Sequence, residues 1–215
     1  MKIPNWVSTI KFLCFDVDGT LCRSIPQVWE TIKGDFIESI SKKLRISFAD
    51  ADKYVSERYK ILGSTTKVLE EAGIDGKEFF NNVYSKLDFS KIIKKDSLLV
   101  KLIVELKKKY LVGILSNGGR ESVVKKLRAV GLEEKIFNPF LTTYEMKSLK
   151  PDPAPFLKAL EMAGASPEES VYIGDSVETD IMGAKAVGIK TILVWSKSPE
   201  ADLSIPTIYK LADIF

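Results

Sequence analysis

Four aspartates stand within a few residues of the ends of two apolar runs that lie far apart in the chain. Asp16 and Asp18 follow the first run, and Asp175 and Asp180 follow another. Like charges about 4 Å apart repel by several kcal/mol at an effective dielectric of about 20, so a cluster of them must keep protons or bind a divalent cation. The chain contains no histidine, which leaves oxygen ligands. Such a donor set favours Mg²⁺, whose usual companion is a phosphorylated substrate.

The same residues suggest separate chemical roles. Asp16 is the stronger nucleophile candidate because it is the first polar residue after the run, and aspartates form covalent aspartyl-phosphates. Asp18, two residues on, could give a proton to the leaving oxygen. Lys150, together with Ser116 and the backbone N–H groups of the next two residues, could hold the phosphate. Each fragment alone also fits a turn, a helix cap or a surface lysine, so the argument depends on their common position.

Strands alternating with helices would bring these residues together. The pattern predicts an α/β fold with a doubly wound parallel sheet, helices on both faces and ligands bound at the carboxyl ends of the strands. Those ends carry Asp16, Ser116 and Asp175. The predicted strands are residues 12–15, 111–115, 140–143, 171–174 and 191–194. The predicted helices between them are residues 97 or 98 to 106, capped by Asp96 or Ser97, about 120–130, 153–163 and about 179–187.

A helical insertion interrupts this pattern. Residues 22–95 have apolar side chains at helical spacing, which divides the chain into a catalytic core of residues 1–21 and 96–215 and an inserted unit of residues 22–95. Within the insertion, the polar stretch Ser64, Thr65, Thr66 and Lys67 could select the substrate. It fits equally well as a helix stop at Gly63 followed by Ser64 as the next N-cap.

Composition limits the other classes of function. The net charge is +3 and the basic residues are scattered, which gives nucleic-acid binding little support. No apolar stretch is long enough to cross a bilayer, and the first ten residues lack the apolar core of a signal peptide. Together with Cys14 and Cys22, which we expect to be reduced thiols, these features predict a cytoplasmic protein without a membrane partner.

Four motifs in this order resemble those of the haloacid dehalogenase superfamily of phosphohydrolases. They are Asp16-Val17-Asp18-Gly19-Thr20, Ser116-Asn117, Lys150-Pro151-Asp152 and Gly174-Asp175-Ser176-Val177-Glu178-Thr179-Asp180. The resemblance covers almost the whole chain and shows no departure from the four motifs.

The resemblance implies a role for each residue. Asp16 would be the nucleophile and Asp18 the general acid/base, with Ser116, Asn117 and Lys150 holding the phosphate. Asp175 and Asp180 would complete a Mg²⁺ site with the side chain of Asp16 and the backbone carbonyl of Asp18. The insertion would be the helical cap of subfamily I members, which closes over the substrate.

Several activities remain compatible with the motifs. A phosphatase acting on a small phosphorylated metabolite is favoured, because a 2-haloacid dehalogenase needs neither the metal nor Asp18. A phosphomutase keeps all four motifs, and a non-catalytic phospho-acceptor module would need neither Asp18 nor a long cap. The motifs do not specify the substrate or the oligomeric state.

Overall fold

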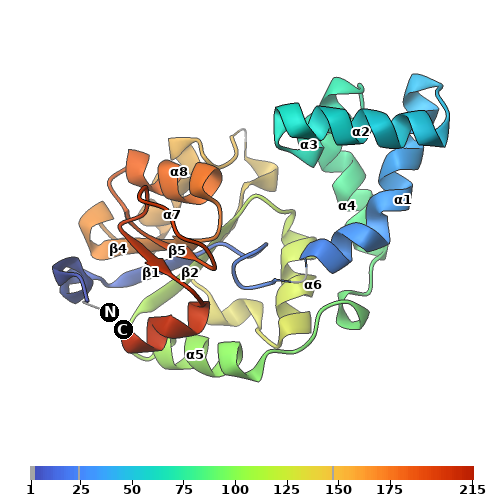
Figure 1. Cartoon of the computed structure of the whole chain (residues 1–215). Helices are drawn as coiled ribbons and strands as arrows, with labels where there is room; N and C mark the ends of the chain where they lie inside the picture. Colours follow the sequence, from blue (N-terminus) through green and yellow to red (C-terminus); the bar gives the residue numbers. More distant parts are fainter. Residues whose placement is uncertain (1–2, 24, 147) are drawn as a thin grey trace. The chain divides into compact units, whose positions relative to one another are not determined.

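A computed structural model describes residues 3–23, 25–146 and 148–215. These residues contain a six-stranded parallel sheet with the strand order β3-β2-β1-β4-β5-β6 (Figure 1). From β1 the chain winds outward through β2 and β3 on one side and through β4, β5 and β6 on the other, which confirms the predicted doubly wound α/β class. The strands are β1 (Phe12–Phe15), β2 (Leu111–Ser116), β3 (Phe140–Thr142), β4 (Ser170–Gly174), β5 (Lys190–Val194) and β6 (Leu203–Ile205).

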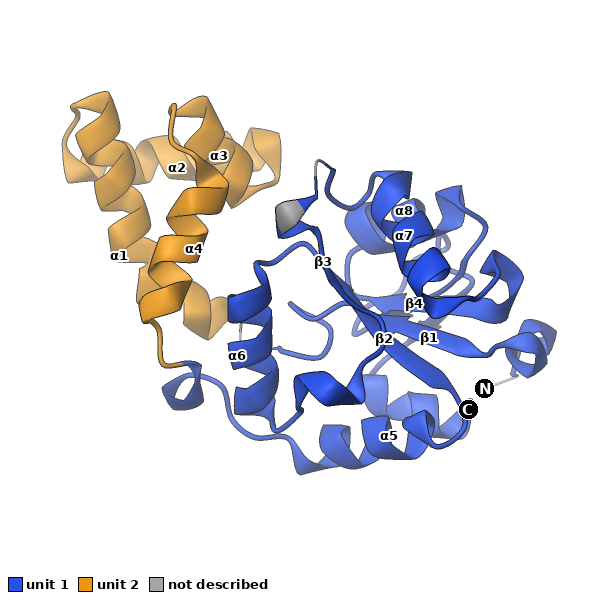
Figure 2. Ribbon diagram, turned by 180° about the vertical axis from the view of Figure 1, so that it is seen from behind, with its two compact units in different colours: residues 1–24, 89–215 blue, residues 25–88 orange. Residues whose placement is uncertain are grey.

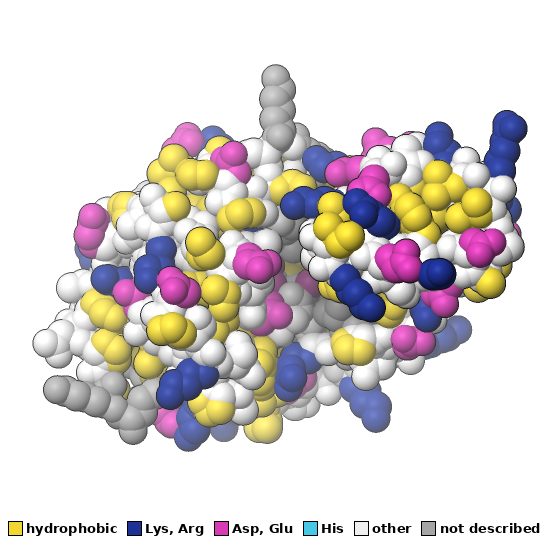
Figure 3. All heavy atoms as spheres, turned by 45° about the horizontal axis from the view of Figure 1, so that its top comes forward, with side chains coloured by type: hydrophobic (Ala, Val, Ile, Leu, Met, Phe, Trp, Pro, Cys, Tyr) yellow, Lys and Arg dark blue, Asp and Glu magenta, His cyan; other side chains and the backbone are white. Residues whose placement is uncertain are grey.

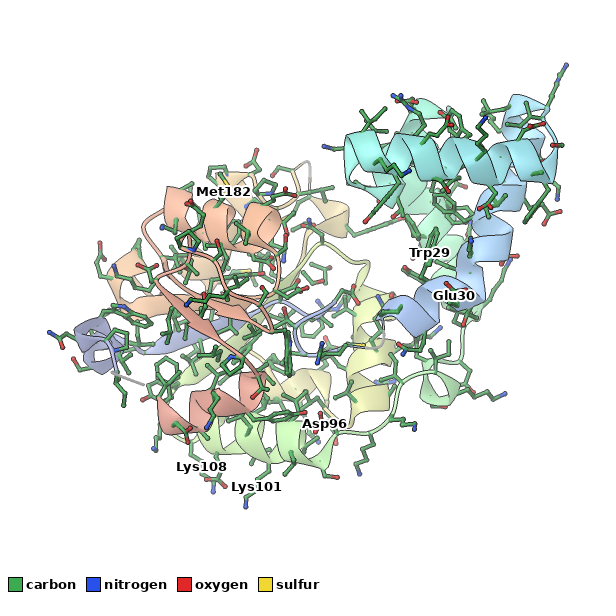
Figure 4. The ribbon with its side chains drawn as sticks, viewed as in Figure 1. Trp29, Glu30, Asp96, Lys101, Lys108 and Met182 are labelled. Carbon is green, nitrogen blue, oxygen red and sulfur yellow. The ribbon has the colours of Figure 1, made fainter. Side chains whose placement is uncertain are left out.

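Helices cover both faces of the sheet. α5 and η7 lie on one face, and α7 and α8 lie on the other (Figure 1). Leu99 and Ile103 of α5 are buried, whereas the side chains of Lys101 and Lys108 point away from the sheet (Figure 4). The helices of this unit are α5 (Ser97–Lys107), α6 (Arg120–Val130), α7 (Pro153–Ala163) and α8 (Met182–Ala186), with a π-helical turn η6 (Val177–Ile181) and short 3₁₀ helices η1 (Asn5–Thr9), η2 (Phe89–Lys91), η3 (Glu134–Ile136), η4 (Thr143–Glu145), η5 (Pro167–Glu169) and η7 (Ile208–Asp213).

The chain divides into two compact units. Unit 1 is Met1–Ser24 with Phe89–Phe215, and unit 2 is Ile25–Asp88 (Figure 2). Residues 22–23 and 89–95 therefore fall in unit 1, although the sequence pattern placed them in the insertion. Within the second of these segments, η2 contacts α6. Unit 2 contains α1 (Ile25–Leu44), α2 (Phe48–Leu62), α3 (Thr65–Glu71) and α4 (Gly76–Lys86).

Unit 2 is a helical bundle with its own aromatic core. Phe36 is fully buried in α1, and its ring contacts Phe79 edge to face with a centroid distance of 5.6 Å. Ser47 caps α2 by accepting the N–H of Asp50, and Gly63 ends it with a φ of +64°. The inserted unit is therefore helical, as the sequence predicts.

Acidic and basic side chains are interspersed across the face of the described residues that Figure 3 shows. Among the described residues, no helix combines the length and the apolar character that a bilayer crossing requires.

Candidate active site

The predicted residues meet at the carboxyl edge of the sheet, beside its central strand. Asp16 follows β1, Ser116 is the last residue of β2, and Asp175 follows β4. β1 pairs with both β2 and β4, so these three strand ends are neighbours. The backbone N–H of Asp16 donates to Ile173 O at 2.9 Å, which extends the pairing of β1 with β4 to the aspartate itself.

Three carboxylates form a cluster at this edge. One oxygen from each of Asp16, Asp175 and Asp180 lies within 4.8 Å of the others. Asp180 comes from the π-helical turn η6 and is held there by the backbone N–H of Ser176, at 3.1 Å from Oδ2. The Thr20 hydroxyl donates to Asp175 Oδ1 at 3.1 Å. This all-oxygen donor set fits a hard divalent cation such as Mg²⁺.

A buried lysine lies among the carboxylates. Lys150 Nζ donates to Asp16 Oδ1 and to Asp180 Oδ1, each at 2.7 Å. It also donates to the Tyr172 hydroxyl at 2.7 Å, and that hydroxyl donates in turn to Leu115 O. All three protons of the ammonium therefore have acceptors, which is the condition for keeping a charge away from water.

Burial and charge shift the pKa values of these groups. Burial raises the pKa of Asp16 to about 7, although the Lys150 ammonium opposes the rise. Burial and the nearby charge of Asp180 raise the pKa of Asp175 to about 6. Burial lowers the pKa of Lys150, but the Asp16 and Asp180 carboxylates together outweigh it and the net shift is upward. The carboxylates are thus held in an environment where an added cation would be stabilising.

Two glycines make room for the carboxylates. A Cβ at Gly19, whose φ is +89°, would lie 2.2 Å from Asp175 Oδ2, and a Cβ at Gly174 would lie 2.4 Å from Asp180 Oδ2. Any side chain at Gly19 or Gly174 would therefore displace the carboxylate next to it. The glycines of the first and last motifs are therefore part of the construction of the site.

We expect Gly19→Ala to weaken Mg²⁺ binding by about tenfold or more, since the added methyl group must displace Asp175. The positive φ adds a stability cost of about 1 kcal/mol. Gly164→Ala is the matched control, because Gly164 also has a positive φ, +62°, but no atom lies within 4 Å of its added Cβ. Calorimetric titration with Mg²⁺ separates the two effects. Equal Mg²⁺ affinity in both variants would contradict the assigned role of Gly19.

The second motif forms a loop that also supports Lys150. The Asn117 side-chain oxygen accepts the backbone N–H of Lys150 and the Thr143 hydroxyl, and its amide donates to Lys150 O at 3.0 Å. The Gly118 N–H donates to Ser116 Oγ at 3.2 Å. The Asn117 side chain thus positions the lysine, and the loop presents the Ser116 hydroxyl beside the strand ends.

Asp18 has a partner that the sequence did not reveal. Lys126 Nζ, from α6, donates to Asp18 Oδ1 at 2.8 Å and to Oδ2 at 2.9 Å. Sequence reasoning also missed Tyr172, which holds Lys150. The available signal for Lys126 was its place in the apolar stripe of α6, between Val123 and Leu127, where a lysine is unusual.

The candidate substrate-selecting residues lie in unit 2. Ser64 caps α3 by accepting the N–H of Lys67 at 3.4 Å, which supports the plainer of its two interpretations. Thr65 lines a cavity of about 500 Å³ within unit 2, together with Trp29 of α1, which is labelled in Figure 4. Thr66 packs against Gly76, at the start of α4. The structure therefore gives Thr65 a place in a cavity and Ser64 a structural role.

Comparisons with known proteins agree with this geometry. The family model of the haloacid dehalogenase-like hydrolases matches residues 10–188. The pyrophosphatase PpaX of Bacillus mycoides is 28% identical over 214 residues, covering 90% of this chain and 88% of that protein. A crystal structure of a HAD phosphatase from Thermococcus onnurineus is 25% identical with a TM-score of 0.72, covering 95% of this chain and 97% of that one. The magnesium-bound YfnB of Bacillus subtilis, 20% identical with the same coverage, has the same fold with a TM-score of 0.65. Since the family model spans most of the sequence and all four motifs meet in one site, this chain belongs to the haloacid dehalogenase-like hydrolases.

Proposed function

We propose that the protein is a Mg²⁺-dependent phosphohydrolase that acts on a small phosphorylated metabolite through an aspartyl-phosphate on Asp16. The observation that carries the proposal is the convergence of Asp16 and Asp180 on the buried Lys150, with Asp175 within 4.8 Å. The names of the relatives support it, since they include a pyrophosphatase, a phosphatase and a magnesium-bound protein. Pyrophosphate therefore joins phosphate monoesters as a candidate substrate.

In the first half-reaction, an Asp16 oxygen attacks phosphorus and forms a bond to it. The bond from phosphorus to the leaving oxygen breaks, its electron pair stays on that oxygen, and Asp18 supplies the proton. In the second half-reaction, Asp18 takes a proton from water as the water oxygen forms a bond to phosphorus. The bond from phosphorus to the Asp16 oxygen breaks, its electron pair stays on that oxygen, and phosphate and the Asp16 carboxylate are released. Ser116 and Lys150 hold the phosphoryl oxygens during both steps, for which one N–H of Lys150 exchanges its carboxylate acceptor for a phosphoryl oxygen.

The metal site in this proposal consists of the side chains of Asp16, Asp175 and Asp180 with the backbone carbonyl of Asp18. When bound, Mg²⁺ supplies positive charge to the oxygens of the transferring phosphoryl group. We also propose that unit 2 is the cap, which excludes bulk water from the reaction, and that Thr65 helps to select the substrate from the cavity that it lines.

The metal-free protein should lose stability as the pH rises from about 4 to about 7. The pKa values of Asp16 and Asp175 are raised in the folded chain to about 7 and about 6, from the ordinary aspartate value of 3.8, so the folded state binds more protons in this interval. Mg²⁺ binds the deprotonated carboxylates, so its stabilisation should grow with pH. Thermal unfolding with and without Mg²⁺ should show a larger Mg²⁺-induced rise in Tm at pH 8 than at pH 5. An equal rise at both pH values would contradict the proposed metal ligands.

A phosphate-release screen tests the function itself. The substrates are p-nitrophenyl phosphate, pyrophosphate, phosphoglycolate, sugar phosphates and nucleotides, and the controls are EDTA treatment and a 2-haloacid assayed for halide release. We expect Mg²⁺-dependent phosphate release from at least one substrate and no halide release. Halide release, or no turnover of any phosphorylated compound, would reject the phosphohydrolase.

A further inference from the structure

Lys126 is one of the most deeply buried charged residues that the structure describes. Lys126 is 1% exposed, and its ammonium lies 5.6 Å from the centroid of the Phe89 ring. On the same face of α6, the apolar residues Val123, Leu127 and Val130 are buried as well. Moving an ammonium into such surroundings is costly, and a buried ion pair often stabilises a fold no better than apolar side chains of the same volume. Stability alone is therefore a weak reason for a lysine here.

One partner of the Lys126 ammonium is Asp18, the proposed acid/base of the reaction. Lys126 Nζ donates to both oxygens of Asp18, at 2.8 and 2.9 Å. The Asp18 side chain is 33% exposed, so without the lysine its carboxylate could turn toward water and occupy several orientations. The two hydrogen bonds fix the carboxylate against α6.

This orientation places Asp18 beside the phosphate-holding loop. A Cβ built on Gly118 would lie 3.5 Å from Ser116 Oγ and 3.7 Å from Asp18 Oδ2, so both groups approach the same point of that loop. Asp16 is held separately by Lys150. Each aspartate of the first motif therefore has its own buried lysine, one from α6 and one from the segment before α7.

We propose that Lys126 is a positioning residue for the proton transfers of Asp18, an inference that rests on the proposed function. By holding both carboxylate oxygens, Lys126 keeps Asp18 facing the loop that bears Ser116, and in the proposal Asp18 exchanges its proton with the leaving oxygen and later with the attacking water from that position. Loss of alignment in an acid/base group lowers the rate most where the leaving oxygen depends on a proton. A lysine that merely linked α6 to the loop would affect all substrates alike.

Two esters of similar shape separate these roles. p-Nitrophenolate leaves readily without a proton, whereas phenolate is a poorer leaving group, and kcat/KM reports the step in which the leaving group departs when that transfer is the first irreversible step. We expect Lys126→Met to lower kcat/KM for phenyl phosphate by about tenfold or more, and for p-nitrophenyl phosphate by a clearly smaller factor. Lys125→Met is the matched control, since Lys125 is the adjacent lysine of α6 and pairs with Glu121 instead. It should leave both values unchanged.

A double-mutant cycle checks that Lys126 acts through Asp18. In an Asp18→Asn background, Lys126→Met should change kcat/KM for phenyl phosphate by no more than about twofold, because the proton transfer is already lost. Lys126→Gln keeps a hydrogen-bond donor without the charge. Its ratio of kcat/KM for phenyl phosphate to kcat/KM for p-nitrophenyl phosphate should lie between the ratios of wild type and Lys126→Met. It provides the measurement if Lys126→Met fails to fold.

The outcomes distinguish this inference from the proposed function. Equal losses on both esters, or a full additional loss in the Asp18→Asn background, would overturn the role of Lys126 while leaving an active phosphohydrolase. Kinetics of Lys126→Met that match those of Lys125→Met would do the same. A wild-type protein that turns over neither ester would overturn the proposed function and this inference together.

Discussion

Asp16→Asn should abolish turnover, with a fall in kcat on the order of 10⁴-fold or more. The amide is nearly isosteric with the carboxylate but cannot form an acyl-phosphate, and it removes one of the three carboxylates from the acidic cluster. Phosphate release from the best substrate of the screen measures the effect.

The stability of the same variant provides the control. Burial raises the pKa of Asp16 to about 7, so ionising this group near neutral pH opposes folding in the metal-free chain. Asp16→Asn should therefore unfold at the same temperature as wild type or higher at pH 8 without metal. We therefore expect Asp16→Asn to lose activity without losing stability, which is the usual result where an active-site residue lowers the stability of the fold. An Asn variant that retains activity within tenfold of wild type would exclude Asp16 as the nucleophile.

Lys150→Met should destabilise the metal-free protein by about 3–5 kcal/mol at neutral pH. Lys150 is 5% exposed and supplies the ammonium that both Asp16 and Asp180 bind, so its loss leaves buried carboxylates without a cation. The loss should be smaller at pH 4 than at pH 7.5, because Asp16, whose pKa is raised to about 7, is protonated at pH 4 and no longer needs the positive charge. Urea unfolding at pH 4 and pH 7.5 measures both values.

A second lysine provides the comparison for that experiment. Lys158 lies on α7, close in sequence to Lys150, but it is exposed and pairs with Glu161 at 2.9 Å. An exposed pair of this kind contributes about 0–1 kcal/mol, so Lys158→Met should change little. Addition of Mg²⁺ should recover part of the stability of Lys150→Met, since the cation replaces the missing charge among the carboxylates. Equal stabilities of the two variants would contradict the central position of Lys150.

The sequence was sufficient to predict those residues of the site whose position follows from their place at the end of a strand. Asp16, Ser116 and Asp175 each follow or end an apolar run that predicts a strand. Because parallel strands bring their carboxyl ends to one edge of the sheet, these three residues were expected to lie together. The ends of α2 were also predictable, since Ser47 and Gly63 are local capping signals. β6 was missed because three residues carry too little alternation to be recognised, and Pro206 follows directly.

The hydrogen-bond partners of the site residues could not be predicted from the sequence. Lys126 and Asp18 are 108 positions apart, and Tyr172 and Lys150 are 22 apart, so only the folded chain shows that they bond. The backbone N–H of Asn117 was expected at the phosphate, whereas the bonds of its side chain to Lys150 depend on a loop whose path the sequence does not specify. The limits of the inserted unit were displaced for a related reason, since η2 belongs to unit 1 through its contact with α6.

Chemical trapping of the intermediate tests the central claim most directly. The protein is mixed with Mg²⁺ and its best phosphorylated substrate, quenched within one turnover, and treated with borohydride, which reduces an acyl-phosphate to an alcohol. Peptide mass spectrometry should then find homoserine in place of Asp16, only when substrate and Mg²⁺ are both present, and none in Asp16→Asn. Turnover with no reduced residue, or with homoserine at Asp18 or Asp175, would contradict covalent catalysis by Asp16.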